Sequence, residues 1–359
     1  MNILEKAKVL TEAGSYDSCG PKQCEVNVKS GLGGIYYAKA ENKNCKIFKT
    51  LMSNTCAYDC KYCGNTCSKK KAMYEPRELA TLFNHIHKEM KVDGLFLTSG
   101  VHKDADFMTE KMIESVKILR NEFHYTGYVH FKVLPGTSYD LIKQASELSN
   151  RMSINIEAPN SSVMSELSSC KDYKTDILRR QAWVSRMNLR SGQTTQMIVN
   201  KYSKDKDVLR MMEWEYKNIK LKRMYFSAFR PVSGTKMQNE KAEPISRQNH
   251  LYNVDFLVRC YGYEYKEFIE VMDDGMLPNE DPKVAIARSM FEKPVDINKA
   301  SYEELVRVPG IGPVTASRIF ERKGKIRSFA DLDNLGATLE RAKPFVSVDG
   351  RRQMSLMEF

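Results

Sequence analysis

Four cysteines lie within twelve positions of the chain, in the stretch NTCAYDCKYCGNTC that starts at residue 54. Cys56, Cys60 and Cys63 follow the spacing C-x3-C-x2-C, and Cys67 comes four residues later. Structural zinc usually takes four ligands, often as two separated C-x2-C pairs, and no second pair follows at the spacing of a zinc ribbon. Three thiolates on a four-iron cube instead leave one iron open to a further ligand. The spacing therefore favours an iron–sulfur cluster, with zinc as the alternative.

The same spacing, with the aromatic Tyr62 directly before the third cysteine, resembles the radical S-adenosylmethionine (radical SAM) superfamily. The resemblance implies that Cys56, Cys60 and Cys63 hold a [4Fe-4S] cluster. It also implies that the amino and carboxylate groups of S-adenosylmethionine bind the fourth iron. Reduction by one electron would then cleave this cofactor to methionine and a 5′-deoxyadenosyl radical, which abstracts hydrogen. Tyr62 would belong to the cofactor site.

The composition narrows the class of protein. The 359 residues carry a formal net charge of +11, which favours a polyanionic partner, most simply nucleic acid. No run of about 18 uncharged apolar residues occurs, so we expect no membrane-spanning helix. The start MNILEKAKVL lacks the apolar segment and cleavage site of a secretory signal, which predicts a cytoplasmic protein. In that reducing compartment the nine cysteines are poor candidates for disulfides.

Strands and helices must position the cysteine loop, and the sequence predicts both in alternation. Short apolar runs bounded by turn residues predict strands, and apolar positions at helical spacing predict the helices between them. The alternation predicts an α/β fold, a partial (β/α)6 TIM-like barrel with its chemistry at the C-terminal ends of the strands. The expected strands are 46–53, 94–100, 127–136, 152–160, 194–200 and 223–229, and the helices of the first half are 75–90, 104–123 and 138–149.

Polar side chains recur on one face of four successive predicted strands. In the strand at 152–160, Ser153, Asn155 and Glu157 alternate with apolar neighbours. Such a stripe is costly to bury without partners, and a ligand in the barrel lumen would supply them. An internal hydrogen-bond network is the alternative. The other members of the stripe are His130, Lys132, Thr194, Gln196, Asn200, Tyr225 and Ser227.

The radical SAM resemblance assigns further residues to S-adenosylmethionine. The second strand of that family ends in a glycine-rich motif that contacts the methionyl amino group. Here Ser99 and Gly100 stand in its place, within Thr-Ser-Gly instead of the usual Gly-Gly-Glu. The fourth strand often supplies a polar contact to the ribose, for which Asn155 and Glu157 are the candidates. We add Gln196 from the polar face of the next strand.

The remaining cysteines suggest no second cluster. Cys19 and Cys24 lie in a loop-like stretch before the first strand, and Cys67 follows the third predicted ligand. With Cys45 they would provide the four ligands of an auxiliary cluster, but their spacing matches no such pattern. We expect structural thiols, with a catalytic or redox role for Cys67 as the alternative.

The C-terminal stretch 296–335 resembles a helix-hairpin-helix, a module that binds DNA without sequence specificity. Its hairpin reads VPGIG, and the two glycines allow a tight turn and a close approach of another molecule. The helix that begins at Pro313 presents free N–H groups, which form a site for phosphate. The predicted nucleic-acid-binding residues are Gly310, Gly312, Thr315, Arg318, Lys323 and Lys325. We expect a second, degenerate hairpin at 335–337; a module that has lost nucleic-acid binding is the alternative.

A radical SAM barrel followed by a helix-hairpin-helix is similar to one prokaryotic family, which is assigned to DNA modification or repair and associated with uracil-DNA glycosylase-like partners. The matching pieces are 94–101, 225–232 and 250–263, and Asn200 stands where we expect glycine. The resemblance implies an enzyme that uses its radical on duplex DNA, with a reductant for the cluster and a glycosylase-like partner. We expect Lys132 and Arg230 to guide an anionic substrate to the barrel.

Two other functions stay open at this point. One is a radical SAM enzyme that modifies tRNA or other RNA. The other is a zinc- or cluster-stabilised DNA-binding protein without catalysis. In either case we divide the chain into an N-terminal extension, the barrel, a helical linker and the nucleic-acid-binding domain, at 1–45, 46–232, 233–293 and 294–359.

Overall fold

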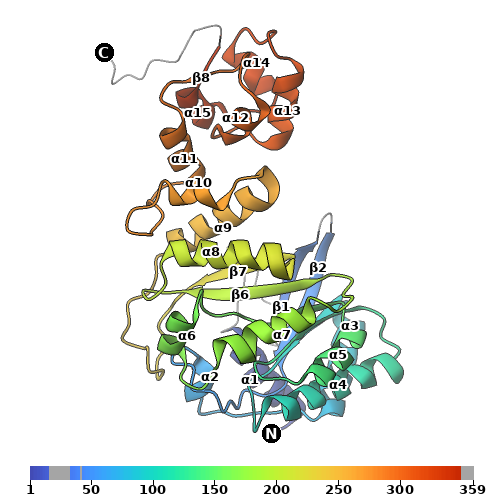
Figure 1. The fold of residues 1–359 in the computed structure, drawn as a ribbon. Coiled ribbons are helices and arrows are strands. Elements are labelled where there is room, and N and C mark those ends of the chain that lie inside the picture. Colours follow the sequence, from blue (N-terminus) through green and yellow to red (C-terminus); the bar gives the residue numbers. More distant parts are fainter. Residues whose placement is uncertain (16–32, 41–42, 349–359) are drawn as a thin grey trace. The chain divides into compact units, whose positions relative to one another are not determined.

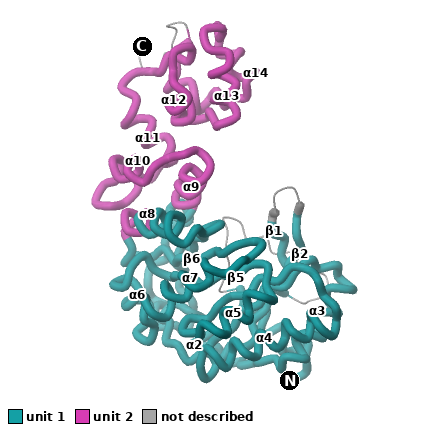
Figure 2. The backbone as a smooth tube through the Cα atoms, turned by 45° about the vertical axis from the view of Figure 1, so that its right-hand side comes forward, with its two compact units in different colours: residues 1–203, 210–248 teal, residues 204–209, 249–359 magenta. Residues whose placement is uncertain are grey.

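The computed structural model describes residues 1–15, 33–40 and 43–348. Cys19 and Cys24, for which structural thiols are predicted, lie outside the described residues. The chain divides into two compact units, which we describe separately (Figure 2). The first comprises residues 1–203 and 210–248, and the second comprises residues 204–209 and 249–359. The predicted domain limits at 45, 232 and 293 stay predictions.

A seven-stranded sheet forms the centre of the first unit, and its strands follow one another in sequence order (Figure 1). The last six strands are parallel, and the first pairs antiparallel with the second. This arrangement confirms the predicted α/β partial barrel. The strands are β1 (Ile35–Ala40), β2 (Lys43–Leu51), β3 (Gly94–Thr98), β4 (Tyr128–Lys132), β5 (Arg151–Ser153), β6 (Gln193–Val199) and β7 (Arg223–Ala228).

Helices cross between the parallel strands, and each buries one apolar face. In the helix at 76–90, Phe83 stacks against Phe48 of β2 with ring centroids 6.4 Å apart. Burial of each such ring contributes about 1.5–3 kcal/mol to folding. The helices are α1 (Ile3–Gly14), α2 (Gly64–Cys67), α3 (Pro76–Met90), α4 (Ala105–Asn121), α5 (Tyr139–Leu148), α6 (Ser161–Leu167), η2 (Tyr173–Leu178), α7 (Arg179–Val184), α8 (Asp205–Trp214) and η3 (Glu215–Ile219).

The strand predicted at 152–160 is shorter than expected. Regular pairing stops at Ser153, because the Thr195 hydroxyl of β6 replaces part of the backbone ladder. This hydroxyl donates to the Ile154 carbonyl at 2.7 Å and accepts from the Ile156 N–H at 3.1 Å. The backbone then turns at Glu157, which has a φ of +60°. Residues 154–157 therefore do not continue β5 as a regular strand. A second difference is β1, which the sequence analysis did not predict.

The second unit consists mainly of helices. The helix predicted at 246–272 is interrupted at Gly262, whose φ of +72° does not continue a helix. Two helix pairs follow it, α12 with α13 and α14 with α15. The helices are α9 (Ile245–Tyr261), which starts in the first unit, α10 (Tyr265–Ile269), α11 (Pro282–Met290), α12 (Tyr302–Arg307), α13 (Pro313–Glu321), α14 (Phe329–Asn334), α15 (Leu339–Ala342) and η4 (Lys343–Phe345), with short strands β8 (Val295–Asp296) and β9 (Val346–Ser347).

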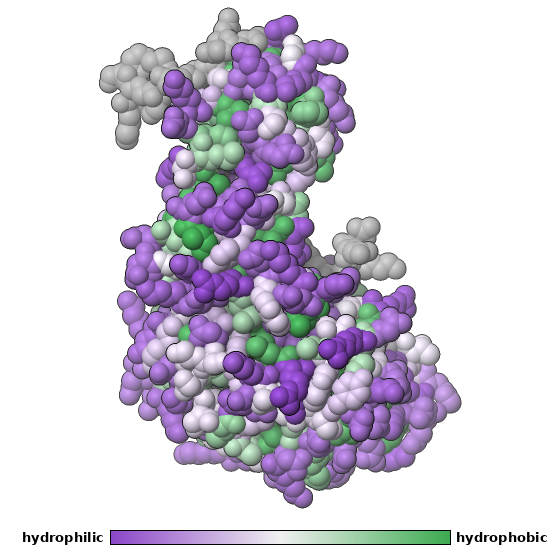
Figure 3. Space-filling view, viewed as in Figure 1, coloured by the Kyte–Doolittle hydropathy of each residue, from purple (hydrophilic) through white to green (hydrophobic). Residues whose placement is uncertain are grey.

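The surface that Figure 3 shows is largely hydrophilic, with small apolar areas between the polar ones. Among the described residues, no helix combines the length and the apolar character needed to cross a membrane.

Candidate functional site

The cysteine loop leaves the sheet at the C-terminal end of β2 and is held against the end of β3. The Gly100 N–H donates to the Ser53 carbonyl at 2.7 Å, and the Val101 N–H lies 3.4 Å from the Cys56 sulfur. A Cβ atom at position 100 would lie 2.5 Å from the Thr55 carbonyl oxygen. Glycine at this position therefore allows the loop to approach the strand end. This is the one glycine of the Thr98-Ser99-Gly100 sequence.

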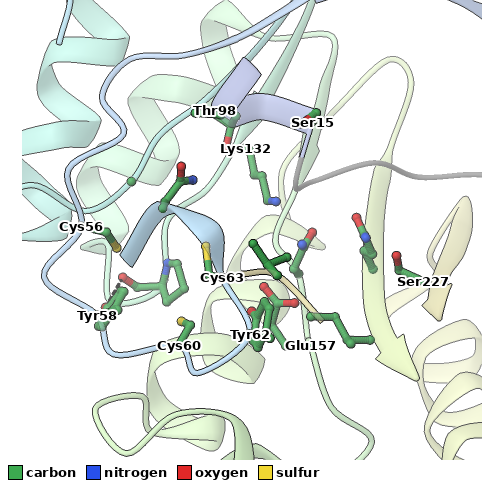
Figure 4. A pocket seen from close by; sticks show the side chains of 18 of the residues that line it. Ser15, Cys56, Tyr58, Cys60, Tyr62, Cys63, Thr98, Lys132, Glu157 and Ser227 are labelled. Atoms are coloured by element: carbon green, nitrogen blue, oxygen red, sulfur yellow. Dashed lines mark hydrogen bonds between the residues drawn. The ribbon is translucent and has the colours of Figure 1, made fainter. Parts of the chain in front are cut away.

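One cavity of about 570 Å³ opens at the C-terminal ends of the strands. Cys56, Cys60 and Cys63 line it, and in Figure 4 they lie along one side of the pocket. The other predicted cofactor residues line the same cavity, and they are Tyr62, Ser99, Gly100, Asn155, Glu157 and Gln196. The structure thus brings together all the residues that the sequence assigned to cluster and cofactor, although their roles stay predictions.

The chemistry of the donor set suits an iron–sulfur cluster, since three thiols line one cavity. Among the described residues, no group of three or more His, Cys, Asp or Glu side chains is arranged to hold one metal ion. Thiolates that each bind a different iron of a cube need not meet at one point. Burial raises the pKa of the Cys60 thiol, and it raises the pKa of Cys63 to about 12. Positive charge must therefore replace these protons, which a bound cluster does.

Asp59, within the cysteine loop, clamps this loop to the segment that follows α6. Its carboxylate accepts hydrogen bonds from the Ser168 hydroxyl at 2.6 Å and from the Ser169 hydroxyl at 2.5 Å. Burial opposes the charged form, but these hydrogen bonds hold the pKa of Asp59 well below its usual range. The Lys61 N–H also donates to the Leu167 carbonyl at 2.9 Å. The cysteine loop is thus fixed on both sides of Cys60.

Lys171 follows this clamp and lines the cavity, and the sequence analysis missed it. Its ammonium lies 5.3 Å from the centre of the Tyr58 ring in the cysteine loop, and Cys60 lines the same cavity. Burial alone would lower the pKa of Lys171, but the nearby Cys60 and Glu157 raise it above its ordinary range. No motif marks this lysine in the sequence, because it reaches the cysteines only through the Asp59 clamp.

Glu157 faces Tyr62 across the cavity wall, and the two lie side by side in Figure 4. Burial, together with the nearby Glu157 carboxylate, raises the pKa of Tyr62. The backbone of Glu157 is tied to β6, since its N–H donates to the Gln196 carbonyl at 3.0 Å. Its left-handed backbone conformation is sparsely populated for non-glycine residues, which is common at functional sites.

The polar stripe predicted on the strands divides into two groups. Lys132 and Ser227 line the cavity, and so does Arg230 just beyond β7. His130 instead stacks on Phe96 with ring centroids 4.1 Å apart, and its Nε2 lies 2.8 Å from the Ser153 hydroxyl. For His130 and Ser153 the contacts agree with the alternative interpretation, an internal hydrogen-bond network. Thr194 and Tyr225 are not among the cavity residues either.

Asn200 does not line the cavity. Its side-chain amide donates to the Ile198 carbonyl at 3.2 Å, and its carbonyl oxygen accepts from the Tyr202 N–H at 2.9 Å. The asparagine therefore stabilises the turn after β6, at the place where the resemblance suggested a glycine. Cys67 lies outside the cavity as well, with its sulfur 3.3 Å from the Gly64 carbonyl oxygen.

The two hairpins of the second unit pack against each other. The Thr338 N–H donates to the Gly310 carbonyl at 2.9 Å, and the Thr315 hydroxyl donates to the Gly336 carbonyl at 3.1 Å. A Cβ at Gly310 would lie only 2.4 Å from the Thr338 carbonyl oxygen, so the close packing requires glycine. Gly336, in the predicted second hairpin, has a φ of +97°.

The predicted nucleic-acid-binding residues differ in what they contact. Thr315 is buried, and Arg318 donates to the Leu335 carbonyl at 3.3 Å, so both side chains hold the second hairpin. Lys323 and Lys325 are exposed after α13. The lysines and the backbone around Gly312 are thus the parts of the predicted set that are available to a ligand.

Lys283 supports the first hairpin from α11, and the sequence analysis missed it too. Its ammonium donates to the Ile311 carbonyl at 2.6 Å and lies 4.7 Å from the centre of the Tyr261 ring. Burial, with the nearby charge of Arg341, lowers the pKa of Lys283 to about 7. The hairpin is therefore braced by residues that precede the helix-hairpin-helix itself.

One family model matches a part of the second unit. Residues 291–346 match the family model described as "helix-hairpin-helix motif". No protein with a curated description matches the chain.

Solved structures with a similar fold are distant. The FeFe-hydrogenase maturase HydG from Carboxydothermus hydrogenoformans is 14% identical, with a TM-score of 0.47 over 59% of this chain and 51% of that chain. Methylornithine synthase (PylB) is 13% identical, with a TM-score of 0.44 over 73% of this chain and 67% of that chain. Coproporphyrinogen III oxidase (HemN) from Escherichia coli, described as a radical SAM enzyme, is 14% identical, with a TM-score of 0.43 over 68% of this chain and 58% of that chain.

A second HydG structure is 11% identical, with a TM-score of 0.48, and the alignment spans 49% of that chain. This chain therefore spans about half the length of the HydG structures that it matches. The function proposed below rests on the residues of this chain.

Proposed function

We propose that this chain is a radical SAM enzyme, with a [4Fe-4S] cluster on Cys56, Cys60 and Cys63 and S-adenosylmethionine in the same cavity. The observation that supports it most is that the three thiols line the same cavity as polar side chains from the C-terminal ends of the parallel strands. When bound, cluster and cofactor would supply a 5′-deoxyadenosyl radical that abstracts hydrogen from a substrate.

The residues of the cavity have distinct tasks in this proposal. Ser99 and Gly100 present hydroxyl and backbone oxygens at the end of β3, where an amino group can be held. Asn155 and Gln196 supply amides for the ribose and the base of the cofactor. Tyr62 and Glu157 form the part of the cavity wall between the cysteine loop and β6. Lys132 and Arg230 place positive charge at the cavity for an anionic substrate.

The substrate that we propose is DNA, and the reaction is a modification or repair step. The second unit presents a glycine hairpin and two exposed lysines, which suit contacts to phosphates without reading of sequence. The net charge of +11 adds a general attraction to polyanions. A reductant for the cluster and a uracil-DNA glycosylase-like partner belong to the proposal through the resemblance alone, as does a cytoplasmic location.

The test uses anaerobically reconstituted and reduced protein. We expect 5′-deoxyadenosine to form from S-adenosylmethionine, and its amount to rise when duplex DNA is added. The Cys60→Ala protein should give none, while the Cys67→Ala protein should match the unchanged chain. Stimulation by tRNA but not by duplex DNA would move the substrate to RNA. No product from protein with a full iron–sulfur content, with either nucleic acid, would contradict the proposal.

A further inference from the structure

We propose that Lys171 is a positioning residue that sets the reduction potential of the cluster, because its ammonium lies over the Tyr58 ring of the cysteine loop and lines the same cavity as the ligand Cys60. The inference rests on the proposed function, since it needs a cluster on the three cysteines. The inference goes beyond the proposed function because it assigns an electrostatic role to a residue that lies far from the cysteine motif in the sequence.

The first line of evidence is the way in which Lys171 is held. Asp59 accepts hydrogen bonds from the hydroxyls of Ser168 and Ser169, and it also accepts from the Ser169 N–H at 3.1 Å. The Cys170 N–H lies 3.3 Å from the same carboxylate. These contacts connect Asp59, the residue directly before Cys60, with the three residues directly before Lys171. A surface lysine would have no need of such a fixed backbone.

The second line of evidence is what surrounds the ammonium. Lys171 lines the cavity with the three cysteines, and its Nζ lies over the Tyr58 ring at 5.3 Å. Cys56, Cys60 and Glu157 line the same cavity, and the negative charge of these groups raises the pKa of Lys171. Lys171 therefore brings positive charge to the cysteine side of the cavity.

The physical consequence follows from charge. A low-potential one-electron donor, such as an iron–sulfur or flavin protein, would pass one electron to the cluster, and no bond or proton changes. The reduced cluster carries one more negative charge next to three thiolates. A fixed cation in a poorly solvated site stabilises the more negative state, and hydrogen bonds to cluster sulfurs act in the same direction. Lys171 should therefore make reduction easier.

The experiment is a redox titration of reconstituted protein without S-adenosylmethionine, followed by electron paramagnetic resonance of the reduced cluster. Lys171→Met and Lys171→Gln remove the charge, and Lys171→Arg keeps it. Lys174→Met is the matched control, because Lys174 is exposed three residues away and does not line the cavity. At the midpoint of the unchanged protein, both neutral variants should hold about tenfold less reduced relative to oxidised cluster, a shift of about 59 mV for one electron. Arginine and the control should change it little.

The outcomes separate the inference from the proposed function. If the unchanged protein takes up no iron–sulfur cluster, the proposed function fails. If it does, and the two neutral variants keep its potential, the inference is overturned while the proposed function stands. Loss of cluster content in the neutral variants without a change in potential would assign Lys171 a purely structural role, and this too would overturn it. A lowered potential that arginine restores supports it.

Discussion

The cysteine cavity of the first unit and the hairpins of the second unit both depend on a close backbone contact at a glycine, but the two regions suit different ligands. Each depends on a glycine whose Cβ would collide with a backbone oxygen, at 2.5 Å for Gly100 and at 2.4 Å for Gly310. In the first unit Gly100 lines the cavity that also holds the three cysteines. In the second unit the side chains of Thr315 and Arg318 hold the hairpins together, and Lys323 and Lys325 are exposed. Radical chemistry needs enclosure, whereas phosphate binding needs accessible donors.

A half-buried lysine in the first unit and a buried lysine in the second sharpen the contrast. Lys171 has a thiol and a carboxylate as neighbours, and its pKa is raised in spite of burial. Burial and the nearby positive charge of Arg341 both disfavour the charged form of Lys283, and its pKa falls to about 7. The same residue type therefore serves as a cation beside thiols in one unit and as a hydrogen-bond donor that loses its proton near pH 7 in the other. Each of the following changes should affect one unit and spare the other.

The largest expected effect is that of Cys60→Ala, which removes a predicted cluster ligand. Iron and sulfide should fall to background, since two thiolates hold a cube poorly. Duplex binding by the second unit should stay unchanged in a gel-shift assay. Cys67→Ala is the control, and a Cys67→Ala protein that lost its iron as completely would show that the wrong cysteines have been assigned.

Gly310→Ala should weaken duplex binding by about tenfold, or about 1.4 kcal/mol. The added Cβ meets the Thr338 carbonyl, and the φ of +82° is strained for alanine. Gly262→Ala is the control, because its φ of +72° imposes the same strain with no atom within 4 Å of the new Cβ. Iron content should not change in either variant. Equal loss of binding in both would attribute the effect to backbone strain instead of hairpin packing.

Gly100→Ala is the corresponding change in the first unit. Overpacking against Thr55 should cost about 1–3 kcal/mol and lower the iron retained per chain. Fluorescence of the two tryptophans, Trp183 and Trp214, reports on unfolding of this unit, because both lie in it. A variant with normal stability and full iron would show that the loop tolerates displacement from β3.

The pair Lys323→Ala and Lys325→Ala should reduce the dependence of duplex affinity on salt. Loss of two phosphate contacts lowers the slope of log affinity against log salt by about two. Lys174→Ala, an exposed lysine of the first unit, provides the control. An unchanged slope in the double variant would place the phosphate contacts elsewhere.

The effect that builds up most gradually concerns pH and Lys283. The ordinary pKa near 10.5 applies to the unfolded chain, and the folded value is about 7. Between these values the unfolded chain binds more protons, so stability should rise as pH increases above about 7, by on the order of 1 kcal/mol per pH unit. Below that pH both states are protonated and the slope vanishes. Amide hydrogen exchange in α13 measures it, and Lys283→Met should remove the rise; a rise that persists would assign it to another group.

The sequence predicted those features that depend on local periods and spacing. Apolar spacing predicted α3 and α4 well, and the C-x3-C-x2-C motif identified three residues that share a cavity. It missed features that depend on distant contacts. Lys171 reaches Cys60 because Asp59 binds residues more than a hundred positions later, and β5 ends early because Thr195 of another strand takes its hydrogen bonds. Periodicity cannot report such contacts.

The most direct test of the central claim is the metal content of the anaerobically reconstituted full chain. Iron, sulfide and zinc should be measured in one sample, together with protein concentration. The proposed cluster predicts about four iron and four sulfide per chain and no stoichiometric zinc. One zinc per chain with background iron would contradict the radical SAM assignment and leave a zinc-stabilised binding protein in its place.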